Sequence, residues 1–147
     1  MNYRKKFRIS GIQKDSPFCD TLKAMWKHHI KKIKKRYLRY KQTQGVEELH
    51  DLRISFRRLR YNLEPYCVCL KPNKFKFLYE TLVELQNILG EKRDLDVMEE
   101  KLKATYAELG VDLPPALTEQ WLKRKEELAG QIDEKLNNFF SRIKDYF

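Results

Sequence analysis

Glycine and proline are scarce in this sequence, with only five of each among 147 residues. Because these two residues mark most turns, their scarcity argues against a loop-rich β architecture. No apolar run approaches the roughly 18 residues that a membrane-spanning helix needs, and the amino terminus has no apolar signal core. The sequence therefore predicts a protein without a membrane span and without a membrane partner.

Cysteine is also rare, and its number, three, is odd. Cys67 and Cys69 lie too close along the chain for an easy disulfide, and no CxxC pair forms a metal knuckle. We expect the cysteines to be small hydrophobic residues of the core, in a reducing, cytoplasmic compartment.

Patterns typical of catalysis or metal binding are missing as well. There is no Gly-rich phosphate loop, no Ser-His-Asp spacing and no isolated pair of carboxylates. His28, His29 and His50 fall on different faces or helices, without HxxxH or HExxH spacing. The prediction is a protein that is not an enzyme and needs no metal or cofactor, with a metal or phosphate-accepting role of His50 as the minor alternative.

Charge is abundant and unevenly distributed. Charged residues make up 35% of the chain and hydrophobic residues 41%, which is typical of a soluble, charge-rich helical protein. Residues 1–71 contain 19 Lys and Arg against 6 Asp and Glu, whereas residues 72–147 contain 12 against 15. This asymmetry points to an anionic partner that the first half of the chain recruits.

The apolar spacing predicts an all-α fold, an up-and-down antiparallel bundle of four to five helices with a long C-terminal helix. Residues 1–14 form a basic arm, and residues 15–147 a single helical domain. We expect Pro65 to interrupt the second helix, Gly90 to end the third, Asp94 to cap the fourth, and Gly110 to open the last break. The predicted helices cover residues 17–41, 46–64 with a short piece to 70, 74–89, 94–109 and 116–147.

The most informative stretch is residues 49–63. Leu49, Leu52, Phe56, Leu59 and Leu63 recur every three or four residues as the apolar stripe of a helix. A basic stripe follows one residue later and lies about 100° from the apolar stripe, beside the core rather than opposite to it. Its members are His50, Arg53, Arg57 and Arg60.

These arginines are planar donors that suit phosphate oxygens, and few carboxylates lie near them in the sequence. The first helix carries a similar stripe, Lys27, Lys31 and Lys34. If the two helices pack antiparallel, both stripes face one basic groove. Arg58 lies on the other side of the arginine stripe, where it either extends the groove or pairs with an acid. A solubilising face laced with ion pairs is the alternative for the whole pattern.

Two motifs resemble the signatures of the CHAD domain, the conserved histidine α-helical domain. The first is His50-x-x-Arg53 followed by Arg57-Arg58-Leu59-Arg60, and the second is Gly90-Glu91-Lys92-Arg93-Asp94-Leu95-Asp96-Val97. The resemblance implies an all-helical fold and binding of inorganic polyphosphate through a basic surface. Domains of this family usually contain two similar four-helix halves, and this chain resembles one of them.

Two assignments stay open at this stage. Arg93 either pairs with Asp94 or Asp96 or reaches the groove as a further phosphate ligand. The final helix carries more apolar surface than one bundle needs, so Phe139, Phe140 and Ile143 are predicted to form a homodimer interface, with closure of a monomeric bundle as the competing interpretation.

The leading hypothesis is non-catalytic binding of polyphosphate, a flexible polyanion that needs many donors and little shape complementarity. An RNA- or DNA-binding helical domain that uses the same surface is the alternative from another class. Base recognition would require exposed aromatic side chains, and Tyr61 is the main candidate within the first motif. A bundle with incidental charge is the third hypothesis.

Overall fold

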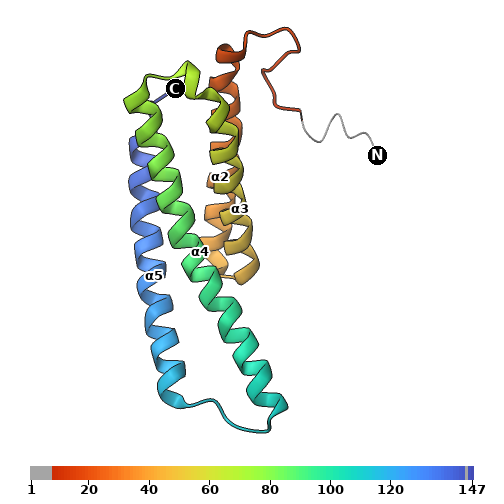
Figure 1. The fold of residues 1–147 in the computed structure, drawn as a ribbon, viewed down its shortest axis with the longest axis vertical. Coiled ribbons are helices and arrows are strands. Elements are labelled where there is room, and N and C mark those ends of the chain that lie inside the picture. The colour runs from red at the N-terminus through yellow and green to blue at the C-terminus, as the bar shows by residue number, and fades with distance from the viewer. Residues whose placement is uncertain (1–7, 145) are drawn as a thin grey trace.

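Four α-helices joined by short connections make up the described part of the chain, which comprises residues 8–144 and 146–147 of a computed structural model (Figure 1). Successive helices run up and down, so the predicted all-α antiparallel bundle is confirmed. No helix in these residues is long and apolar enough to cross a membrane. The elements are η1 (Phe18–Thr21), α2 (Leu22–Thr43), α3 (Val46–Leu63), η2 (Glu64–Cys69), α4 (Pro72–Glu108) and α5 (Pro115–Arg142).

The helix boundaries before α4 follow the local signals. α3 begins directly after Gly45 and ends at Leu63, where Pro65 converts the chain into the 3₁₀ helix η2. The apolar stripe of α3 is buried completely, since all five of its members have 0% exposed surface. On α2, one apolar face is buried as well, and His29 lies within it; its apolar members include Leu22, Trp26, Ile30, Ile33, Tyr37 and Tyr40.

The predicted break between a third and a fourth helix is wrong, because α4 continues from Pro72 to Glu108. Leu82, Leu85 and Leu89 stay in phase with Lys92 and Asp96, and all five are buried. The free energy of packing this continuous stripe exceeds the roughly 1 kcal/mol that a helical glycine costs at Gly90. Asp94 consequently lies exposed in the middle of a helix and caps nothing.

α4 ends instead at the second predicted break. Gly110 has a φ of 66°, a left-handed conformation that glycine adopts without strain, and the chain then turns into α5. The α4–α5 hairpin extends beyond the shorter α2–α3 hairpin (Figure 1). At the level where α3 begins, Lys125 of α5 pairs with Asp96 and Glu99 of α4.

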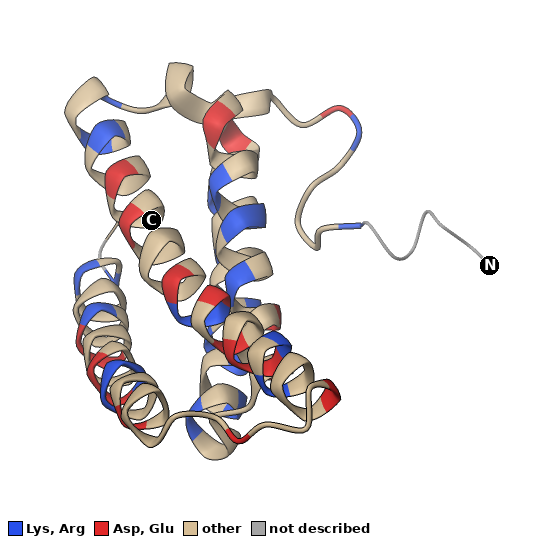
Figure 2. Ribbon diagram, turned by 60° about the horizontal axis from the view of Figure 1, so that its bottom comes forward, with Lys and Arg blue, Asp and Glu red and all other residues tan. Residues whose placement is uncertain are grey.

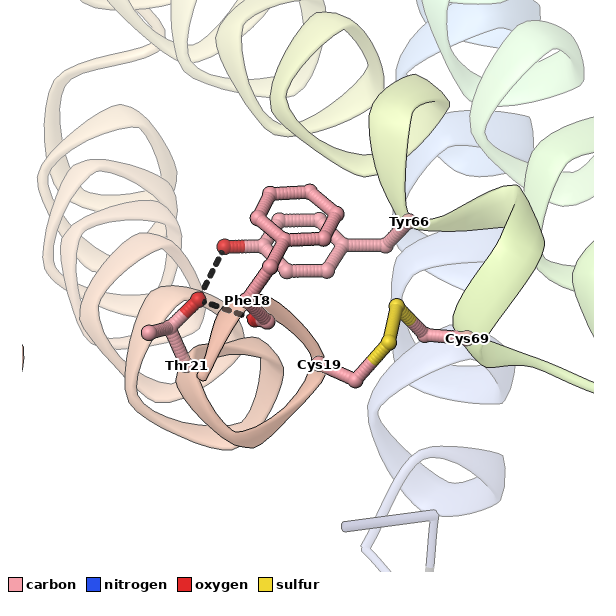
Figure 3. Close-up of a disulfide and its surroundings, with 5 residues drawn as sticks. All are labelled: Phe18, Cys19, Thr21, Tyr66 and Cys69. Atoms are coloured by element: carbon pink, nitrogen blue, oxygen red, sulfur yellow. Dashed lines mark hydrogen bonds between the residues drawn. A yellow bond between two sulfur atoms is a disulfide. The ribbon is translucent and has the colours of Figure 1, made fainter. Parts of the chain in front are cut away.

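The cysteine prediction is wrong. Cys19 of η1 forms a disulfide with Cys69 of η2, 50 residues away (Figure 3). Cys67 is exposed as a free thiol. The Tyr66 ring stacks on Phe18 with 4.4 Å between centroids, and its hydroxyl shares a hydrogen bond of 2.6 Å with Thr21. Since disulfides persist in oxidising compartments, the cysteines no longer support a cytoplasmic location, which stays an untested prediction.

The predicted dimer residues belong to the core of the single chain. Phe139 and Ile143 are 2% and 7% exposed, and Phe139 packs edge-on against Phe56 of α3. Phe140 is half-buried and contacts Tyr37 of α2. The competing interpretation, closure of the monomeric bundle, therefore describes these side chains, and a homodimer would need other residues. Whether one forms is untested.

The basic arm lies partly outside the described residues, which begin at residue 8. From there to residue 17 the chain has turns and no regular helix. Ile9 and Ile12 pack against the core, so this part of the arm is attached to the bundle. The division into an arm and a domain stays a prediction.

Candidate polyanion-binding face

Two basic residues of the first motif, Arg53 and Arg60, lie on the side of α3 that borders α4. A Cβ atom at Gly90 of α4 would lie 3.6 Å from Nε of Arg53, an ordinary van der Waals distance, so this guanidinium lies beside Gly90. Seven residues later on α3, the guanidinium of Arg60 lies 6.0 Å from the ring centroid of Tyr79, which precedes Gly90 on α4. The two helices thus run antiparallel, with Arg53 at the level of Gly90 and Arg60 at the level of Tyr79.

This register brings the second motif to the first. One turn beyond Gly90, Arg93 comes to the level of His50, one turn before Arg53 on α3. Gln86 falls between Gly90 and Tyr79 and therefore at the level of Arg57. We call this surface the arginine face; its residues are His50, Arg53, Arg57, Arg60 and Arg93.

Several polar atoms of this region are buried without a hydrogen-bond partner in the described residues. They are Nε of Arg60, Nη1 of Arg93 and Oε1 of Gln86. The nearest carboxylate oxygen to Arg60 is that of Glu64, at 3.7 Å from Nε, which is too long for a hydrogen bond. Two of these atoms are guanidinium donors that lack the partner buried polar groups normally have, whereas Oε1 of Gln86 is an acceptor.

Arg93 forms no ion pair with a carboxylate among the described residues. Neither Asp94 nor Asp96 pairs with Arg93: Asp94 is exposed, whereas Asp96 is buried with Lys92 at 3.9 Å and Lys125 at 3.1 Å. The ion-pair interpretation of Arg93 is therefore wrong. The arginine is partly buried, and the helix register places it at the level of His50 on α3.

The predicted groove between the lysine stripe of α2 and the arginine stripe of α3 is not formed. Lys27, Lys31 and Lys34 border α5, where they line a hollow with Phe140 and Phe147. We call these three lysines the lysine face. α3 packs against the opposite side of α2, because Arg36 of α2 donates hydrogen bonds to the Asp51 carbonyl oxygen and the Ser55 hydroxyl.

Arg58 lies towards the α2 side of α3 and not on the arginine face. Burial, followed by the charges of His28, Lys32 and finally Arg58, lowers the pKa of His29 of α2 to about 4. His29 is thus a neutral residue of the core at neutral pH, which agrees with its position on the apolar face. His28 is partly exposed, and burial followed by the charge of Lys32 lowers its pKa also.

One polar cluster was missed at the sequence level. Lys92 and Asp96 are 6% and 7% exposed, and Lys125 of α5 bridges Asp96 and Glu99. Burial lowers the pKa of Lys92 although Asp96 acts in the opposite direction. The signal was present in the spacing, since Leu85, Leu89, Lys92 and Asp96 continue one helical stripe. In the described residues, no group of three or more His, Cys, Asp or Glu side chains could hold a metal ion.

These features define a four-helix bundle whose two sequence motifs meet on one arginine-rich face. The family model of the CHAD domain matches residues 6–103, which is more than half of the chain. The protein therefore belongs to the CHAD domain family. No curated protein and no solved structure matches the chain significantly.

Proposed function

We propose that this protein binds inorganic polyphosphate without chemical conversion, through the arginine face of α3 and α4. CHAD domains are known for polyphosphate binding, and arginines from both motifs of the family lie on this face. The observation that carries the proposal is the buried Nε of Arg60 and Nη1 of Arg93, which have no hydrogen-bond partner among the described residues. Both atoms are buried, so these guanidinium groups would turn outward to make charge-assisted hydrogen bonds with phosphate oxygens.

The chemistry of the face suits a linear phosphate chain. Arg53, Arg57 and Arg60 follow one another along about 10 Å of α3, and Arg93 extends the row from α4 at the level of His50. Donors in a row contact successive phosphates of a flexible chain and need no defined ligand shape. Counterion release would provide much of the binding free energy, so the affinity should fall steeply with added salt.

The direct test is titration with tripolyphosphate and with long-chain polyphosphate by calorimetry. The triple variant Arg53→Gln, Arg57→Gln, Arg60→Gln should bind both ligands at least tenfold more weakly, with unchanged helical circular dichroism. The matched control removes three exposed positive charges elsewhere, by Lys76→Gln, Lys101→Gln and Lys123→Gln, and should change the affinity by less than twofold. Equal losses in both variants would show that only net charge matters and would defeat the assignment of the face.

Nucleic acid is the second candidate ligand, favoured by a single observation. Tyr61 is 52% exposed beside Arg60, whose guanidinium lies 4.7 Å from the centroid of the Tyr61 ring. Such a ring can stack on a base. Competition of single-stranded RNA against polyphosphate at equal phosphate concentration separates the candidates, and tighter RNA binding would replace the first proposal.

A further inference from the structure

α2 carries charge of one sign only. Its 22 residues include nine Lys and Arg and no Asp or Glu. In the part of the chain that the structure describes, none of these nine takes part in an ion pair, whereas Lys92, Lys103, Lys125 and Lys135 of α4 and α5 all contact carboxylates. Within the described residues, the fold thus pairs several cations of α4 and α5 with carboxylates and pairs none of those on α2.

The lysine face borders two neighbouring hollows. Lys27 and Lys31 line one hollow together with Asp20 and His28. They also line the next hollow, together with Lys34, Lys144 and the aromatic side chains of Phe140 on α5 and Phe147 after it. The ammonium group of Lys34 lies 5.7 Å from the ring centroid of Phe140, so the aromatic floor holds this side chain in place. These lysines form a strip along roughly 10 Å of α2.

Further cations connect the lysine face with the arginine face across the outside of the α2–α3 hairpin. Lys32, Lys35 and Arg39 line a hollow beside Arg36 and Asp51 at the α2–α3 boundary. On α3, Arg58 is exposed and continues the positive surface to Arg57, an exposed member of the arginine face. Lys and Arg predominate on this hairpin in Figure 2, whereas α4 and α5 mix both signs.

We propose that the lysine face is a second contact surface for the same polyphosphate chain, and that one long chain crosses the α2–α3 hairpin to contact both faces. This inference rests on the proposed function. Two packed helices present about 30 Å of surface between the faces. Tripolyphosphate is too short for this path and binds the arginine face alone. A long chain that is held on one face presents its remaining phosphates to the other at high effective concentration, so its affinity increases.

The experiment compares tripolyphosphate with long-chain polyphosphate on four proteins. These are the wild type, the arginine variant and the control variant described above, and a lysine variant with Lys27→Gln, Lys31→Gln and Lys34→Gln. The lysine variant should bind long-chain polyphosphate at least tenfold more weakly than the control variant and bind tripolyphosphate within twofold of it. The arginine variant should lose affinity for both ligands. Circular dichroism verifies that every variant is folded.

Three results would overturn the inference. If the lysine variant binds the long chain as tightly as the control, the lysine face does not contact the ligand. If it loses tripolyphosphate to the same extent as the long chain, the two faces act as one site. If it loses single-stranded RNA but keeps long-chain polyphosphate, the surface serves nucleic acid. A wild type that binds neither phosphate ligand would instead remove the proposed function, and the inference with it.

Discussion

Loss of the Cys19–Cys69 disulfide should lower the free energy of unfolding by about 4 kcal/mol. The bond joins residues 50 positions apart, so it closes a loop of that length in the unfolded chain. The chain-entropy relation for such a loop gives about 4 kcal/mol at 25 °C. The folded state changes little, because the Phe18–Tyr66 stack and the Thr21–Tyr66 hydrogen bond hold η1 against η2 independently of the sulfur atoms.

Urea unfolding of Cys19→Ser/Cys69→Ser, followed by circular dichroism, measures this effect. With a slope of about 1.5 kcal/mol/M, the urea midpoint should fall by nearly 3 M. Cys67→Ser is the matched control, since this exposed thiol is unpaired and its replacement should leave the midpoint within about 0.3 M. A reducing agent should lower the midpoint of the wild type and leave that of the double variant unchanged.

Thiol titration provides the refutation. The native protein should show one reactive thiol without reducing agent and three after reduction and unfolding. If three thiols react before reduction and the reducing agent does not shift the midpoint, the two cysteines are not bonded in solution. The contacts of Tyr66 would then hold the two 3₁₀ segments together alone.

Two further predictions concern buried ionisable groups. Asp96→Ala should lower the free energy of unfolding in urea by about 3–5 kcal/mol, because it leaves the buried ammonium of Lys92 without its counter-charge. The control Asp94→Ala, on the exposed side of α4, should lower it by less than about 0.5 kcal/mol. Similar losses in both variants would contradict a structural role of the Lys92–Asp96 pair. The pKa of His29 is about 4 in the folded protein, against an ordinary value of 6.5. As the pH drops, the imidazole is therefore protonated in the unfolded chain before it is protonated in the folded protein. The free energy of unfolding should fall between about pH 6.5 and about pH 4. His29→Gln should flatten the pH dependence of the urea midpoint within this window, and an unchanged slope would contradict the burial of a neutral imidazole.

The apolar spacing determined the helical class and most helix boundaries. Leu49 to Leu63 repeat every three or four residues, and a side chain at this spacing has only one face of a helix to occupy. Pro65 and Gly110 end helices for local reasons, a missing N–H in one case and a left-handed backbone in the other. The two family motifs were also recognisable from residue types alone, because both are contiguous in the chain.

Gly90 shows where local signals fail. Its propensity to end a helix is worth only about 1 kcal/mol, and burial of the leucines on either side outweighs it. The same continuity places Lys92 and Asp96 on the buried stripe, where the turn expected from the sequence would have exposed them. Both errors have one origin, since the strength of tertiary packing cannot be read from a single residue.

The sequence by itself determined an all-α chain, an arginine stripe beside the core of its second helix, and an excess of positive charge in its first half. Only the tertiary structure decided which surfaces meet. A stripe at the side of a helix can border either neighbour, and the order of helices around the bundle places Arg53 against α4 and Lys27 beside α5. The Cys19–Cys69 pairing depended on the same information, because residues 50 positions apart come together only when η1 and η2 meet at one end of the bundle.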